Sequence, residues 1–321
     1  MTVAAHGGDI YQNQITYDFS VNTNPLPLPE ILQKRMAEAA VHSNRYPQYD
    51  NVLLRERLAA LYGFSTEEIV CGNGASELFV AIVHALRPKR VGILAPSFSG
   101  YAWAAQTVGA EVCSIPLQEE NNFAMDMAQM ESLCRHMDGI SLLFLANPAN
   151  PAGNKMEASL LETFLDVCEK KQITVVLDEC FIAFTGTEGY VSWIRKYPHL
   201  IVVRAYTKIY AIPGIRLGYL LAQKDICERM PNCGVMPNVR PTVATAEAVS
   251  YKQTDIGSCS AAAMTKAPRK NSVKYIPAMV AAFLTAEPSM RRPKNSASSL
   301  RRKVAHILAS RTANVVVFMP P

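Results

Sequence analysis

Short apolar segments alternate with amphipathic segments along the first 230 residues, and this alternation limits the possible fold more than any other feature. The apolar segments read VGILAP (91–96), ISLLFLANP (140–148), ITVVLDE (173–179) and LIVVRAY (200–206). Between them, SELFVAIVHAL (76–86) and ASLLETFLDVCEKK (158–171) have the apolar spacing of helices. Such alternation is typical of βαβ units. We therefore predict an α/β fold with a mostly parallel sheet flanked by helices.

Several classes of protein do not fit the composition. The eight cysteines form no CxxC pair and the six histidines have no ligand spacing, so we expect neither a disulfide framework nor a metal site. No apolar run reaches the roughly 18 residues that a membrane span needs. The first residues, MTVAAHGGDIYQ, lack the basic and apolar regions of a signal peptide. We therefore expect a cytoplasmic protein.

Polar residues follow several of the predicted strands. Asn147 and Asn150 follow LLFLA, Asp178 ends ITVVLD, and Lys208 comes two residues after LIVVRAY. In a parallel α/β sheet the ligand binds at the carboxyl ends of the strands, so these side chains are candidates for one site. Each also has an ordinary structural explanation: a connecting turn, a helix cap, or a lysine whose amine reaches solvent.

A second group of residues has the pattern of a phosphate site. In CGNGASELF, the small residues Gly74, Ala75 and Ser76 precede a predicted helix, whose free N–H groups would face an anion. Arg216, eight residues after Lys208, could supply a positive charge. The alternative is an ordinary glycine turn with a serine cap.

Together these features predict a site for pyridoxal phosphate. Lys208 would form a Schiff base with the aldehyde, and Asp178 would pair with the pyridine nitrogen and keep it protonated. The helix N-terminus and Arg216 would hold the phosphate.

Residues from about 6 to 223 resemble a fold-type I pyridoxal-phosphate enzyme of the class I/II aminotransferase superfamily. The resemblance rests on five motifs in family order: RYPQYD, GNGASE, NPANPAG, DECF and YTKIYAIPGIRLGY. HGGDI followed by DFSVNTNPLPLP, and the phenylalanine of DECF, are similar to the threonine-phosphate decarboxylases of cobalamin biosynthesis. The related histidinol-phosphate aminotransferases remain the alternative.

The resemblance implies a role for each matching residue. Lys208 and Asp178 are the catalytic residues, and Asn150 bonds the ring hydroxyl. Tyr101 stacks on the ring, with Phe98 the second candidate. The predicted phosphate ligands are Gly74, Ala75, Ser76, Thr207, Arg216 and Tyr46 of the partner subunit in a homodimer, and the predicted substrate-binding residues are His6 and Asn24.

The resemblance also implies three parts: an N-terminal arm (1–29), a cofactor-binding large domain (30–230) and a remnant of a small domain (231–321). Residues 231–321 carry 13 basic and 3 acidic residues, against 19 and 24 before them. NVRPTVATAEAV and LASRTANVVVF faintly resemble small-domain segments, but the arginine motif that binds the substrate carboxylate is missing. We interpret this part as truncated or frameshifted, or else as a divergent tail.

Further departures concern the site and the tail. Ala205 replaces a phosphate-binding hydroxyl, and Phe181 lacks a phenol that would reach the ring hydroxyl. We expect residues 252–303 to be poorly ordered. They carry few aromatic residues, few glycines and a run of unpaired positive charge, so they would bury too little apolar surface to offset the ordering entropy.

The sequence therefore favours an enzyme that acts on a small phosphorylated amino acid by decarboxylation or transamination, with slow turnover in this chain. The alternatives are a cofactor-binding remnant without activity, and nucleic-acid binding through RRPKNSASSLRRK, which a solvated tail also explains.

Overall fold

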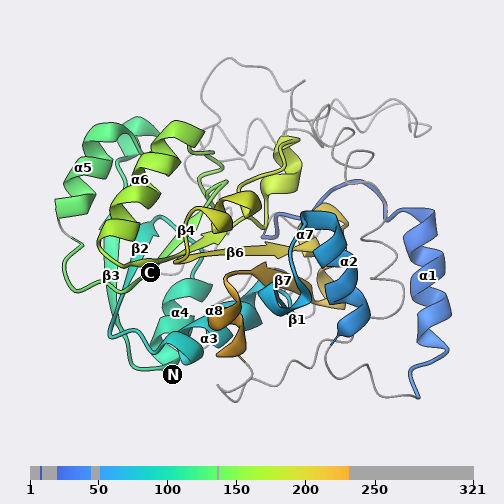
Figure 1. Cartoon of the computed structure of the whole chain (residues 1–321). Coiled ribbons are helices and arrows are strands. Elements are labelled where there is room, and N and C mark those ends of the chain that lie inside the picture. Colours follow the sequence, from blue (N-terminus) through green and yellow to red (C-terminus); the bar gives the residue numbers. More distant parts are fainter. Residues whose placement is uncertain (1–7, 9–19, 45–50, 136, 231–321) are drawn as a thin grey trace, which may run out of the picture.

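The computed structural model describes residues 8, 20–44, 51–135 and 137–230, and its centre is a seven-stranded sheet (Figure 1). The strand order is β1-β7-β6-β5-β4-β2-β3. The pairs β2–β3, β2–β4, β4–β5 and β5–β6 are parallel, whereas β7 runs antiparallel to both of its neighbours. The predicted α/β fold with a mostly parallel sheet is confirmed.

The strands are short and mostly buried. In chain order they are β1 (Ile69–Asn73), β2 (Arg90–Ala95), β3 (Glu111–Pro116), β4 (Leu142–Ala146), β5 (Thr174–Asp178), β6 (Leu200–Ala205) and β7 (Leu217–Leu221). The four apolar segments predicted as strands are β2, β4, β5 and β6. Only 11 residues separate β6 from β7. A parallel crossover needs a dozen or more residues, which is consistent with the antiparallel return of β7.

The α-helices are α1 (Glu30–Ala40), α2 (Val52–Tyr62), α3 (Ala75–Leu86), α4 (Gly100–Thr107), α5 (Met127–Arg135), α6 (Ala158–Lys170), α7 (Tyr206–Ile209) and α8 (Lys224–Glu228). Short 3-10 helices occupy η1 (Thr66–Glu68), η2 (Glu119–Asn121), η3 (Ile182–Thr185), η4 (Val191–Arg195) and η5 (Pro213–Ile215). The two amphipathic segments predicted as helices correspond to α3 and α6.

Helices cover both faces of the sheet, as Figure 1 shows. On one face, Leu161 and Phe164 of α6 belong to the same buried cluster as alternate residues of the central strands. On the other face, Phe79 of α3 and Tyr101 of α4 join the remaining strand residues in a second cluster. Because strand side chains alternate between faces, a sheet covered on both sides needs apolar residues at nearly every position.

The segment before α1 packs against the residues around Lys208. The Asn24 backbone N–H donates to the Lys208 carbonyl at 2.9 Å, and Asn24 Nδ2 donates to the Ile209 carbonyl at 2.8 Å. Helix α1 begins at Glu30, and the division into an arm and a large domain stays a prediction. The predictions for residues 231–321 lie outside the described residues. Within the described part of the chain, no helix is long and apolar enough to cross a membrane.

Strand β7 passes unusually close to the turn that precedes α3. A Cβ atom at Gly218 would lie 2.7 Å from the Gly74 carbonyl carbon and 2.8 Å from the Ala75 nitrogen. Both of these are backbone atoms, so no side-chain rotation can relieve the overlap.

We predict that Gly218→Ala lowers the free energy of unfolding by about 1–3 kcal/mol, because the added methyl group overpacks a site bounded by backbone. Gly214→Ala is the matched control, since a Cβ there would meet nothing within 4 Å. Denaturant unfolding of both variants measures the effect. Equal stability of the two variants would contradict the close approach.

Candidate active site

The structure places the predicted site residues at the carboxyl ends of the sheet strands. Asp178 ends β5, Lys208 lies in α7 directly after β6, and Asn150 lies in the loop after β4. The loop from β1 to α3 and Arg216, just before β7, border the same edge of the sheet. The grouping expected for a parallel sheet is therefore present, and the roles of the individual residues remain predictions.

Asp178 is a buried carboxylate whose hydrogen bonds come from neutral groups. Its side chain accepts a hydrogen bond from the Tyr101 hydroxyl at 2.5 Å and one from the Cys180 backbone N–H at 2.9 Å. Burial raises the pKa of Asp178, and the hydrogen bonds from Cys180 and Tyr101 and the charge of Lys208 oppose that shift. Within the described residues Asp178 forms no salt bridge. A cationic N–H group of a ligand would complete this environment.

The prediction that Tyr101 stacks on the cofactor ring is wrong for this structure. Tyr101 is 0% exposed, its ring stacks on Phe144 at 4.8 Å between centroids, and Phe79 and Phe98 meet it edge-on. A ring enclosed in this way has no free face for a ligand. Tyr101 acts on the site through its hydroxyl and Asp178, and half-buried Phe98, the second candidate, is the aromatic side chain nearer the surface.

Lys208 is partly buried and lies near the positive charge of Arg216 and the negative charge of Asp178. Burial lowers the pKa of the Lys208 amine; Arg216 lowers it further, and the Cys180 thiol and the Asp178 carboxylate oppose the shift. A lowered pKa increases the fraction of neutral amine near pH 7, and the neutral amine is the form that attacks a carbonyl group. Thr207 is buried next to it in the chain.

Arg216 lies against the start of α3, an arrangement that could hold an anion. Gly74 precedes the helix with a φ of +78°, and a Cβ there would lie 2.6 Å from Arg216 Nη2. The guanidinium group therefore sits directly against this turn, where Nη2 also donates to the Asn73 carbonyl at 3.3 Å. Ala75 and Ser76 occupy the first turn, whose N–H groups have no partner within the helix.

Asn150 lies where the N-terminal segment crosses the loop after β4. Its Oδ1 accepts a hydrogen bond from Asn22 Nδ2 at 3.3 Å. If Asn150 Oδ1 is engaged in this way, the Asn150 amide N–H₂ group can donate to a ligand. The sequence singled out Asn24 from this segment but not Asn22.

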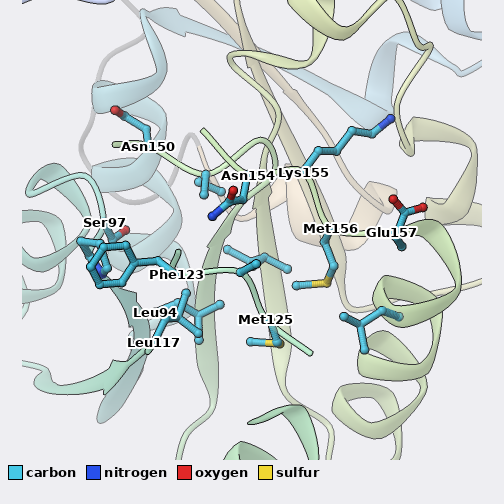
Figure 2. Close-up of a pocket in the computed structure, with 16 residues that line it drawn as sticks. Leu94, Ser97, Leu117, Phe123, Met125, Asn150, Asn154, Lys155, Met156 and Glu157 are labelled. Carbon is cyan, nitrogen blue, oxygen red and sulfur yellow. The ribbon is translucent and has the colours of Figure 1, made fainter. Parts of the chain in front are cut away.

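Asn150 also lines a cavity of about 190 Å³ (Figure 2). Its lining is mainly apolar and includes Leu117, Phe123, Met125 and Met156. Neither Lys208 nor Asp178 lines it. The cavity therefore lies next to the candidate site and does not contain the Lys208 amine or the Asp178 carboxylate.

Two of the predicted site residues cannot be placed, and one contact of the site was not predicted. His6 and Tyr46 lie outside the described residues. Across residues 20–44, 51–135 and 137–230, no three His, Cys, Asp or Glu side chains are arranged to hold a metal ion. The hydrogen bond from the Cys180 backbone N–H to Asp178 could not be predicted, because every residue except proline has a backbone N–H group and the sequence does not mark the one that donates. Ala205, which lacks the hydroxyl of a phosphate ligand, is buried, and Phe181, which lacks a phenol, is half-buried.

Comparison with known proteins agrees with this geometry. The family model for aminotransferase class I and II matches residues 14–284. The threonine-phosphate decarboxylase of Salmonella typhimurium is 34% identical over 231 residues, covering 69% of this chain and 63% of that protein. The histidinol-phosphate aminotransferase of Pyrococcus furiosus is 32% identical over 211 residues, covering 65% of this chain and 60% of that protein.

Among solved structures, the histidinol-phosphate aminotransferase from Clostridium acetobutylicum matches with a TM-score of 0.68 at 28% identity, covering 77% of this chain and 73% of that chain. The chain spans less than two thirds of the length of the two curated relatives just described. Because the family model matches more than half of the residues, the chain belongs to the class I and II aminotransferase family.

Proposed function

We propose that this chain binds pyridoxal phosphate and acts on a small phosphorylated amino acid, with decarboxylation of threonine phosphate in cobalamin biosynthesis as the preferred reaction. The single observation that carries the cofactor proposal is the buried Asp178 carboxylate, whose hydrogen-bond donors among the described residues are neutral. The named relative from Salmonella typhimurium supports the choice of reaction.

The residues present fit this cofactor at three points. Asp178 can accept a hydrogen bond from a protonated ring nitrogen, Lys208 provides an amine of lowered pKa, and Arg216 adjoins the N-terminus of α3 where a phosphate would bind. When bound, pyridoxal phosphate supplies an electron-withdrawing ring that stabilises negative charge on the substrate α-carbon.

Each side chain then has a defined task. Asp178 keeps a proton on the ring nitrogen, and Lys208 holds the cofactor covalently and moves a proton at the substrate carbon. Asn150 donates to the ring hydroxyl, and Phe98 covers one face of the ring. Gly74, Ala75, Ser76, Thr207 and Arg216 bind the phosphate.

Contacts from outside the described residues complete the proposal. We assign Tyr46 of the partner subunit to the cofactor phosphate in a homodimer, and His6 to the border of the substrate site. Asn24 also borders the substrate site, and its two hydrogen bonds to the Lys208 segment support this position.

Transamination is the second candidate, because the relative from Pyrococcus furiosus is a histidinol-phosphate aminotransferase. Both reactions start from the same bound amino acid. They differ in which bond of the α-carbon lies perpendicular to the ring, so the groups that orient the substrate decide between them.

We predict that the protein with pyridoxal phosphate releases carbon dioxide from threonine phosphate without consuming a keto acid. Release of labelled carbon dioxide from carboxyl-labelled threonine phosphate is measured together with amino-group transfer, so even slow turnover identifies the reaction. Asp178→Ala should lower the rate about 10³-fold, or about 4 kcal/mol, because the ring nitrogen loses its partner. Amino transfer alone would favour the second candidate, and bound cofactor without turnover would indicate a remnant.

A second prediction concerns Tyr101. Its hydrogen bond favours the ionised form of Asp178, so Tyr101→Phe should raise the pKa of Asp178 further. As pH falls, Asp178 then becomes protonated earlier, and cofactor affinity should decline at a higher pH in the variant than in the wild type.

The control is Tyr197→Phe, which removes a hydroxyl that donates to Asp166 at 2.7 Å outside the site. Its profile of cofactor affinity against pH should match the wild type. A Tyr101→Phe profile that also matches the wild type would show that the hydroxyl does not support Asp178.

A further inference from the structure

A buried ion pair lies directly behind the candidate site. Arg204 of β6 and Glu179, the residue after β5, have side chains that are 5% and 0% exposed. Arg204 Nε and Nη2 donate to Glu179 Oε2 at 2.8 and 2.6 Å. None of the roles proposed above uses this pair.

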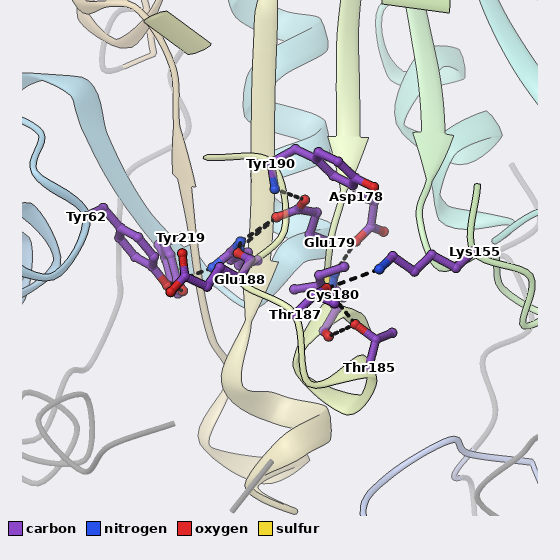
Figure 3. Close-up of polar contacts among 12 residues, drawn as sticks. Tyr62, Lys155, Asp178, Glu179, Cys180, Thr185, Thr187, Glu188, Tyr190 and Tyr219 are labelled. Atoms are coloured by element: carbon purple, nitrogen blue, oxygen red, sulfur yellow. Dashed lines mark hydrogen bonds and ion pairs between the residues drawn. The ribbon is translucent and has the colours of Figure 1, made fainter. Parts of the chain in front are cut away.

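Further hydrogen bonds surround the pair within the described residues, and Figure 3 shows Tyr62, Glu188 and Tyr190 near Glu179. Glu179 Oε1 accepts from the Tyr190 backbone N–H at 2.7 Å, and Arg204 Nη1 donates to the Tyr62 hydroxyl at 3.0 Å. Arg204 Nη2 also donates to the Glu188 carbonyl. The pair thereby connects β5, β6, α2 and the loop before Tyr190.

The space around the pair is closed as well. A Cβ at Gly189, whose φ is +74°, would lie 2.5 Å from Arg204 Nη2 and 2.6 Å from Glu179 Oε2. The loop backbone therefore packs directly against both charged groups. This leaves the two side chains little freedom to adopt another arrangement.

Strand geometry links this pair to the site on the opposite face of the sheet. Successive strand residues point to opposite faces, so Asp178 faces Tyr101 while Glu179 faces Tyr190. The Glu179 N–H donates to the Val203 carbonyl at 2.8 Å, which fixes the end of β5 against β6. Four residues after Arg204, the chain reaches Lys208.

A need for stability alone does not account for such a pair. Burying two charges carries a desolvation penalty, and well-packed apolar residues of similar volume often stabilise a protein equally well. Two N–H groups of Arg204 converge on one oxygen, Glu179 Oε2, while Oε1 accepts from the Tyr190 N–H. These directional contacts fix the relative position of two strand ends, because Arg204 and Glu179 can form them in only a narrow range of arrangements.

We propose that Arg204 and Glu179 are positioning residues that hold the Asp178 carboxylate and the Lys208 amine at the separation that the cofactor requires. This inference rests on the proposed function, since it needs Asp178 and Lys208 to bind opposite ends of one ligand.

The test uses two matched double variants. Glu179→Gln with Arg204→Met removes the pair and keeps an acceptor for the Tyr190 N–H. Glu68→Gln with Arg195→Met makes the same two changes in another Arg–Glu pair, which joins η1 and η4 outside the site. Thermal unfolding without cofactor reports stability, and titration with pyridoxal phosphate reports affinity.

We expect affinity for pyridoxal phosphate to fall about 10-fold or more in the first variant, the usual effect of losing a residue that orients a ligand group. The pH at which the bound cofactor changes colour should shift too, since that pH reports the surroundings of Lys208. The control variant should retain both properties. A folded first variant with wild-type affinity and colour change would overturn the positioning role.

If the first double variant does not fold, Arg204→Lys decides, because lysine keeps the charge and loses the planar fork. Weakened cofactor binding in this variant supports the inference, and wild-type binding overturns it. If the wild type itself binds no pyridoxal phosphate, the proposed function fails and the positioning role falls with it. Cofactor binding by the wild type, with no change in the variants, refutes the positioning role alone.

Discussion

The proposed cofactor site depends on one buried carboxylate, that of Asp178 at the end of β5. Burial disfavours its ionised form, and the Tyr101 hydroxyl and the Cys180 backbone N–H donate hydrogen bonds to it. Such a group costs free energy in the unliganded protein unless a cation approaches it. In the proposed function, a protonated pyridine ring provides that cation.

The neighbouring acidic residues Asp178 and Glu179 have different partners on the two faces of the sheet. Asp178 faces the candidate site with neutral donors, whereas Glu179 pairs with Arg204 through Oε2 and accepts from the Tyr190 N–H through Oε1 on the other face. The separation of the two carboxylates follows from the alternation of strand side chains. It allows one charge to stay available while the adjacent charge fixes the backbone that carries both residues.

The general fold and the grouping of Asn150, Asp178 and Lys208 at one edge of the sheet could be predicted from the sequence, because polar residues that follow apolar strands of a parallel sheet share that edge. The choice between Phe98 and Tyr101 could not. It depends on α4 beginning at Gly100, which turns Tyr101 into the core. The ion pair of Arg204 with Glu179 could not be predicted either, because Arg204 lies within an apolar strand and its partner is 25 residues away in the sequence.

The most direct test of the central claim is to locate the lysine that carries the cofactor. The 321-residue chain is incubated with pyridoxal phosphate, reduced with borohydride and digested, and the labelled peptide is identified by mass spectrometry. The account predicts a single label on Lys208, and no label in Lys208→Ala. A label on another lysine, or none on the wild-type protein, would contradict it.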